Sequence, residues 1–121
     1  MQANLHYNTS NQFNKYSNNS VTINETEFTG NLIVSRDKID TVSINNISDI
    51  DTLYIDEIIG KYKPDLIIFG TGSTIKMPDL KILLQLQKQQ IGFEVMPIPA
   101  LCRTFNYLSG EDRNVVAIVL F

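Results

Sequence analysis

The spacing of hydrophobic residues changes along the chain, and each spacing predicts a different kind of element. Between residues 21 and 44 apolar and polar residues alternate, which is typical of short strands in a sheet with one solvated face. Polar breaks at residues 24–25, 30–31 and 36–38 divide this part into three or four strands. We expect these strands to form either a meander or a pair of hairpins.

A helical spacing follows, with apolar residues at positions i, i+3, i+4 and i+7. The residues that show it are Ile55, Ile58, Ile59 and Tyr62. The helix has three suitable N-caps before it, namely Ser48, Asp49 and Asp51. We expect Gly60 and Pro64 to end it.

The chain is organised around the apolar run at residues 66–69, which follows Pro64 and Asp65 and ends at Gly70 and Gly72. A short apolar run between turn residues predicts a strand that is buried on both faces of a sheet. Most of the remaining chain can be placed around this strand.

A second helix is expected to begin at Pro78, because proline suits the first helical position. Its inward stripe is assigned to Leu80, Leu83, Leu84 and Gln87, widened by Ile82 and Leu86. A strand at residues 91–98, a helix at 100–109 and a strand at 115–121 complete the chain. The second half is thus β-α-β-α-β, and right-handed crossovers would make its first two strands parallel. The pattern predicts an α/β fold.

Composition narrows the classes of function. The 13 acidic and 10 basic residues give a net charge of -3, which argues against a nucleic-acid binder because phosphate neutralisation needs a surplus of lysine and arginine. No apolar stretch approaches the roughly 18 residues of a membrane span, and no leader pattern is visible, so we expect a cytoplasmic location. Cys102 is the single cysteine and His6 the single histidine, so neither an internal disulfide nor a His/Cys metal site is expected, and no cofactor is indicated.

Residues 1–20 are rich in Asn, Ser and Gln and carry few apolar side chains to offset the entropy of ordering. We therefore expect a flexible tail at 1–20 and a single domain at 21–121. The aromatic residues Tyr7, Phe13 and Tyr16 leave room for part of the tail to dock as an edge segment. The oligomeric state does not follow from the sequence.

One candidate site is the loop that contains Gly70, Thr71, Gly72 and Ser73. Glycines after a buried strand let backbone N–H groups approach an anion, and the helix that follows would add its positive dipole end. The loop lacks the third glycine of a dinucleotide-binding motif and the Gly-Lys-Ser/Thr of a P-loop. The alternative interpretation is that the glycines form a tight turn for close packing and that the loop binds no ligand.

A second candidate is the start of the last helix, with Cys102, Arg103, Thr104 and Asn106. Ligands of open α/β sheets bind at the carboxyl ends of the strands, so a crevice is expected between this helix and the glycine loop. Cys102 is either a small buried hydrophobe or a thiolate with a lowered pKa beside Arg103. Arg103 either pairs with Glu111 or Asp112, or binds a carboxylate or a partner.

Several blocks of the chain resemble one small family, and the resemblance covers residues 21–121. The blocks are residues 64–72, Pro78, residues 92–96, residues 100–108 and residues 111–113. The chain resembles the Mth938-like domain-of-unknown-function family, whose members include a mitochondrial complex I assembly factor and the adipogenesis-associated domain protein. The chain departs from the family at Leu101, where relatives carry a small residue, and this leucine would crowd a pocket under the helix start.

The resemblance implies an α/β fold in three layers. A central, mostly parallel mixed sheet would carry helices on one side, with a small N-terminal β-hairpin layer and a helix on the other. It also implies that the last strand runs antiparallel to its neighbours. The family's eukaryotic relatives act through protein partners, and no catalytic activity is established for it.

We therefore expect a non-catalytic protein-interaction or assembly-factor role, with an unidentified protein partner bound around Arg103 and the loop at residues 70–72. The alternative is binding of a small anionic metabolite or nucleotide in the crevice at the carboxyl ends of the strands. A thiol enzyme based on Cys102 is a third hypothesis, for which the sequence offers no histidine as a base, because His6 lies in the tail.

Overall fold

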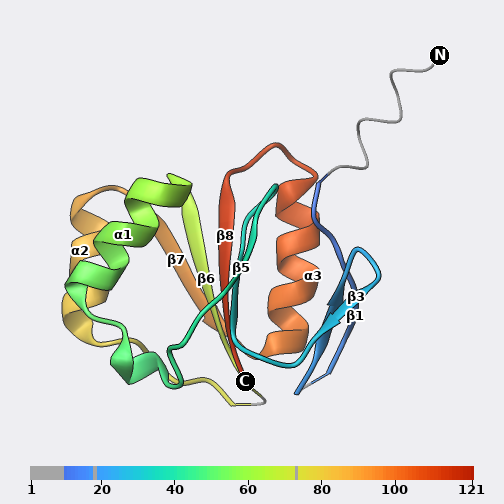
Figure 1. Ribbon diagram of the computed structural model, residues 1–121. Coiled ribbons are helices and arrows are strands. Elements are labelled where there is room, and N and C mark those ends of the chain that lie inside the picture. The colour runs from blue at the N-terminus through green and yellow to red at the C-terminus, as the bar shows by residue number, and fades with distance from the viewer. Residues whose placement is uncertain (1–9, 18, 73) are drawn as a thin grey trace.

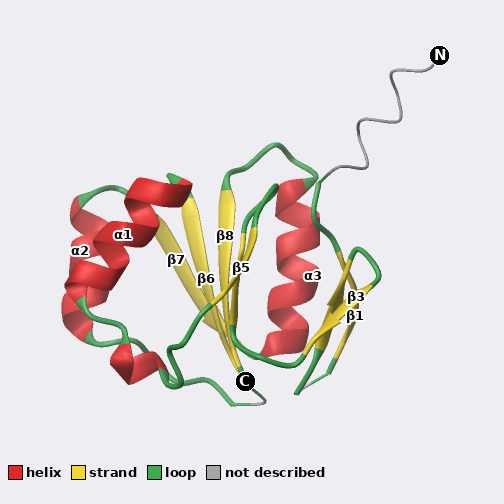
Figure 2. Cartoon of the chain, viewed as in Figure 1, coloured by secondary structure: helices red, strands yellow, loops and turns green. Residues whose placement is uncertain are grey.

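The computed structural model describes residues 10–17, 19–72 and 74–121 (Figures 1 and 2). Its strands are β1 (Phe13–Tyr16), β2 (Val21–Ile23), β3 (Thr26–Phe28), β4 (Leu32–Val34), β5 (Ile39–Thr41), β6 (Leu66–Thr71), β7 (Gly92–Met96) and β8 (Val115–Leu120). Its helices are α1 (Thr52–Tyr62), α2 (Leu80–Lys88) and α3 (Ile98–Ser109), with a short 3-10 helix, η2 (Ile47–Asp49). The strands form a 3-stranded sheet in the order β1-β2-β3 and a 5-stranded sheet in the order β5-β4-β8-β6-β7.

Strand β6 lies inside the larger sheet and pairs in parallel with β7 on one side and β8 on the other. The predicted parallel pairing of the first two strands of the β-α-β-α-β unit is therefore confirmed. The expectation that the last strand runs antiparallel to its neighbours is wrong for β6, because the crossover through α3 returns the chain in the same direction. Strand β8 is antiparallel only to β4.

The larger sheet has an apolar core on each face, because successive side chains of a strand point to opposite sides. Ile67 and Phe69 of β6 pack with the buried residues of α1 and α2. Ile68 packs on the other face with Leu101 and Phe105 of α3. Figure 1 shows α1 and α2 on one side of this sheet and α3 on the other. The predicted α/β class, with a mixed sheet, helices and a small β layer, is confirmed.

The small sheet packs against the side of α3 that faces away from the larger sheet (Figure 2). The rings of Phe13 and Phe105 meet edge to face, with their centroids 5.3 Å apart. The side chain of Asn106 accepts a hydrogen bond from the Phe13 N–H and donates one to the Phe13 carbonyl, both at 2.9 Å. The aromatic residues of the predicted tail allowed part of it to dock as an edge segment, and residues 13–16 do so as β1. Residues 1–9 of the predicted tail lie outside the described residues.

The alternating region forms a pair of hairpins, one of the two predicted arrangements. Strands β2 and β3 are joined by Asn24 and Glu25, whose φ angles of 51° and 74° match a tight two-residue turn. Strands β4 and β5 form the second hairpin. The two hairpins belong to different sheets, which the alternation by itself does not reveal.

The helix boundaries differ from the prediction in three places. Helix α1 has Asp51 as its N-cap, and it continues through Gly60 to a left-handed Lys63. Helix α2 begins after the N-cap Asp79, so Pro78 lies outside it. Helix α3 begins two residues earlier than expected, at Ile98.

The predicted inward stripe of α2 is also wrong. Ile82 and Leu86 are buried, whereas Leu80 and Leu84 are 65% and 52% exposed. With leucine or isoleucine at most positions, the helix offers more than one apolar stripe, and packing against the sheet selects one of them. The unselected leucines remain on the solvent side.

We predict that Asn106→Ala lowers the free energy of unfolding by about 1 to 3 kcal/mol, because both backbone groups of Phe13 lose a partner. Chemical denaturation measures the change, and hydrogen exchange of the Phe13 amide locates it. Gln87→Ala, at an exposed position of α2, is the control and should stay within about 0.5 kcal/mol of wild type. Unchanged exchange of the Phe13 amide in Asn106→Ala would contradict the assignment.

Candidate functional site

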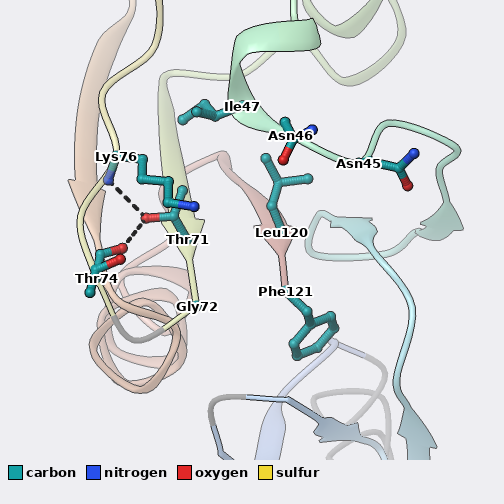
Figure 3. Close-up of a pocket in the computed structure, with 9 residues that line it drawn as sticks. All are labelled: Asn45, Asn46, Ile47, Thr71, Gly72, Thr74, Lys76, Leu120 and Phe121. Carbon is teal, nitrogen blue, oxygen red and sulfur yellow. Dashed lines mark hydrogen bonds between the residues drawn. The ribbon is translucent and has the colours of Figure 1, made fainter.

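A cavity of about 210 Å³ lies at the carboxyl ends of β6 and β8 (Figure 3). Its walls come from the end of β6, the loop that leads to α2, the connection from β5 to η2, and the end of β8. The lining residues are Asn45, Asn46, Ile47, Thr71, Gly72, Thr74, Lys76, Leu120 and Phe121. Adjacent parallel strands end together at this edge, which is where open α/β sheets bind ligands.

Thr71 shapes one wall of the cavity from a buried position. Its hydroxyl donates to the Thr74 carbonyl at 2.6 Å and accepts from the Lys76 N–H at 3.1 Å, as the dashed lines in Figure 3 mark. These two bonds hold the loop in a turn that brings Lys76 beside the end of β6. The side chain of Thr71, part of the loop considered for phosphate binding, therefore has a structural role.

Asn31 holds the opposite wall together. Its side chain donates to the Ile44 carbonyl at 2.6 Å and accepts from the Phe121 N–H at 2.8 Å. The connection from β5 and the end of β8 are thereby fixed to the same residue. Asn45 and Asn46 follow directly and remain exposed, while Ile47 is buried beneath them.

The space expected for a crevice, between the glycine loop and α3, is occupied by close packing. A Cβ atom on Gly70 would lie 2.5 Å from Cδ1 of Leu101, so only glycine allows this approach. The Ile98 N–H donates to the Gly72 carbonyl at 3.0 Å and joins the two loops. The cavity lies on the other side of β6, towards β8.

Of the predicted loop residues, Thr71 and Gly72 line this cavity and Gly70 does not. Gly72 has a φ of +46°, which favours glycine, and its N–H already donates to the Leu120 carbonyl at 3.0 Å. Ser73 lies outside the described residues. The tight-turn interpretation of the loop therefore accounts for each of its glycines.

The predicted residues of α3 are not brought together with the loop as one site. Cys102 is fully buried in the core between α3 and the sheet. Asn106 is committed to the backbone of Phe13. Thr104 is half-buried, and Arg103 is exposed. These four side chains point to different neighbours.

Arg103 makes no ion pair among the residues that the structure describes. Asp112, one of its two expected partners, instead pairs with Arg36 at 2.9 Å. The ion pair proposed for Arg103 with Asp112 is therefore wrong. Its guanidinium is available to solvent.

Burial raises the pKa of the Cys102 thiol to about 12, and the nearby positive charge of Arg103 lowers it only in part. A thiol with such a pKa stays protonated at neutral pH and is a poor nucleophile. The interpretation of Cys102 as a small buried hydrophobe fits the structure. The lowered pKa required by the thiol-enzyme hypothesis is contradicted.

Sequence reasoning missed the residues that complete the cavity, namely Asn45, Asn46, Ile47, Thr74, Lys76, Leu120 and Phe121. Asn45 and Asn46 lie in a polar connection between two expected elements, and Lys76 lies in the loop between the expected central strand and the second helix. Nothing in their spacing placed them together, because they come from three separate parts of the chain. Within the described residues, His, Cys, Asp and Glu form no group of three that could hold a metal ion.

The fold defines the class of protein: a small α/β domain with a mixed sheet and a second, smaller sheet. The chain belongs to the family described as "Protein of unknown function (DUF498/DUF598)", whose profile matches residues 13–120. The resemblance drawn from the sequence is confirmed. The family match begins at β1, eight residues before the predicted domain boundary at residue 21.

Two relatives are informative. The "13 kDa major membrane protein" of Francisella tularensis subsp. holarctica is 30% identical over 115 residues, which cover 89% of each chain. The NADH dehydrogenase (ubiquinone) 1 alpha subcomplex assembly factor 3 of Danio rerio is 34% identical over 56 residues, 46% of this chain. The matched stretch spans only 32% of the Danio rerio protein. In the described part of this chain, no helix is long and apolar enough to cross a membrane.

Solved structures share the fold at low sequence identity. A Xanthomonas campestris protein has a TM-score of 0.85 at 22% identity, covering 95% of this chain and 87% of its own. A Bordetella parapertussis protein has a TM-score of 0.83 at 22% identity, covering 93% and 96%. A Bordetella pertussis protein described as a Mth938-like domain has a TM-score of 0.77 at 18% identity, covering 93% and 87%. These similarities establish the architecture.

We predict that Gly70→Ala destabilises the protein by about 1 to 3 kcal/mol, because the new methyl group overpacks against Leu101. Chemical denaturation gives the value. Gly30→Ala is the matched control, since a Cβ there meets nothing within 4 Å. In a double-mutant cycle with Leu101→Ala, the cost of Gly70→Ala should fall well below its cost in wild type. If the effects of the two substitutions on the free energy of unfolding simply add, contact with Leu101 is not the cause of the destabilisation by Gly70→Ala.

We predict that Cys102 reacts with a thiol reagent at pH 8 only as fast as the protein opens. At a pKa of about 12, about one thiol in ten thousand is ionised at that pH, and burial blocks access as well. Absorbance with Ellman's reagent, in buffer and in denaturing urea, measures both rates. Rapid stoichiometric labelling of the native protein would contradict the buried assignment.

Proposed function

We propose that this chain is a protein-binding domain with an assembly role, and that it binds its partner through the outer surface of its α1–α2 layer. This outer surface comprises Leu53, Ile75, Met77, Leu80 and Leu84. A non-catalytic role is part of the proposal.

The exposed apolar side chains of this layer carry the proposal. Most of the large hydrophobic residues exposed in the described part of the chain belong to the outer surface. They come from α1 and α2, which lie on one side of the larger sheet, and from the loop that leads from the end of β6 to α2 (Figure 1). Exposed apolar side chains that gather on one layer are typical of an interaction site.

The two helices are tied to each other beside this surface. Gln85 of α2 donates to the Thr52 carbonyl at 3.2 Å and to the Asp56 carboxylate at 2.6 Å. A shallow depression between the helices is lined in part by Leu84, Lys81 and Lys88, and also by Asp56, whose carboxylate accepts from Gln85. An apolar side chain of a partner fits this depression, and acidic groups flanking that side chain would meet the two lysines. The partner we propose therefore presents apolar residues with an acidic flank.

The assembly role draws support from the Danio rerio relative, whose name describes an assembly factor. The cytoplasmic location stays a prediction, since the Francisella relative is named a membrane protein. Arg103 lies on α3, which covers the opposite face of the sheet, so the surface expected from the sequence and the outer surface are separate.

We predict that Leu84→Glu weakens partner binding roughly thirtyfold or more, the effect of losing an interface hot spot of about 2 kcal/mol. Affinity capture from the native cell with the wild-type chain identifies the partner, and calorimetry with the purified pair measures the affinity. Leu84 is half exposed, so its substitution should leave the melting temperature nearly unchanged. Arg103→Glu is the matched control on the opposite face and should bind like wild type.

Three results would overturn this proposal. If Arg103→Glu loses binding while Leu84→Glu binds normally, the partner binds at α3 and not at the outer surface. Equal affinities for all three proteins would exclude both faces. Absence of a stoichiometric partner of the wild-type chain would remove the assembly role itself.

A further inference from the structure

We propose that the cavity at the carboxyl ends of β6 and β8 binds a small anion bearing a phosphate or carboxylate group, with Lys76 as its counter-charge and Asn46 as a hydrogen-bond donor. The cavity adjoins the proposed partner interface, because Ile75 and Met77 of that interface flank Lys76 in the same loop, and the inference goes beyond the binding role. It rests on the charge, the free donors, the size and the position of the cavity.

One charged side chain lines the cavity among the described residues. Among the described residues that line it, Lys76 alone has a charged side chain. Lys76 makes no ion pair with any described residue. In Figure 3 its side chain extends past Thr71 towards the space between β6 and β8. An unpaired ammonium group in a concave site attracts an anion, although the chain as a whole carries a net charge of -3.

The remaining donors are few and can be identified. The Thr71 hydroxyl donates to Thr74, and the Gly72 N–H donates to Leu120, so neither is free for a ligand. The amide groups of Asn45 and Asn46 line the cavity from the other wall. Figure 3 shows Asn46 across the cavity from Lys76, with Asn45 farther from it. An anionic oxygen between Lys76 and Asn46 would thus receive a charged and a neutral hydrogen bond.

The apolar part of the cavity lining strengthens these interactions. Ile47 and Leu120 are buried apolar residues that line the cavity. Electrostatic attraction and hydrogen bonds gain strength where apolar groups replace water. The Thr71 and Asn31 hydrogen bonds hold the two walls before any ligand arrives, so little ordering is needed on binding.

The volume selects the size of the ligand. A cavity of about 210 Å³ is smaller than the roughly 300 to 1,000 Å³ of sites for drug-sized molecules. A nucleotide, part of the alternative drawn from the sequence, is therefore too large to be enclosed. The ligand class that fits is a metabolite of a few heavy atoms with one phosphate or carboxylate at its end.

The test is a titration of the isotope-labelled full chain, followed by NMR, with three probes in separate arms. Inorganic phosphate and succinate represent the two anionic groups, and glycerol is the uncharged control. We expect saturable shifts of the Asn46 side-chain amide and the Gly72 N–H with one or both anions, with a Kd near or below about 1 mM, and none with glycerol. The arm that saturates identifies the chemical group.

Lys76→Met keeps the aliphatic stem and removes the charge, and we expect it to weaken anion binding roughly tenfold or more. Lys15→Met, at an exposed position of β1 outside the cavity, is the matched control and should bind like wild type. Both lysines are exposed, so melting curves should show that each variant folds.

The proposal is overturned if shifts grow linearly with concentration in both anion arms, which indicates an adventitious ion only. Equal binding by Lys76→Met and wild type also overturns it, and so does equal weakening in Lys15→Met, because that would show general charge screening. Because the titration uses the isolated chain, its outcome is independent of the partner experiment.

Discussion

The structure depends on the burial of β6 between β7 and β8. Both partners pair with it in parallel, so α2 and α3 are placed by the crossovers that this arrangement requires. A parallel strand pair needs a connection that returns over the sheet, and α2 and α3 are those connections. They cross on opposite faces, and each core forms where a helix covers the alternate side chains of β6.

Helix α3 is packed on two sides, which explains why its sequence looked rich in candidate chemistry. Leu101 approaches Gly70 on the sheet side, while Phe105 and Asn106 hold β1 on the other side. Cys102 fills the interior between them. Because α3 packs on both sides, its polar residue Asn106 as well as its apolar residues are used for structural contacts. Only its solvent side, with Arg103, remains available for another molecule.

The two surfaces proposed for function differ in chemistry. The outer surface of α1 and α2 carries exposed apolar side chains, and a macromolecule that covers them would remove their area from water. The cavity beside Lys76 is small, largely polar and enclosed by loops at a strand end. One surface suits a partner chain and the other a small anion, and the two meet in the loop before α2, where Ile75 and Met77 flank Lys76.

The sequence by itself determined the elements and their class. The run at residues 66–69 predicts a doubly buried strand, and the alternation at 21–44 predicts short strands, because these patterns are local consequences of backbone geometry. Tertiary structure decided which leucines of α2 face the sheet, because its apolar stripes are locally equivalent. It also decided that the crevice near Gly70 is filled and that Asn46 and Lys76 share a cavity. These facts depend on contacts between residues far apart in the chain, which no local pattern encodes.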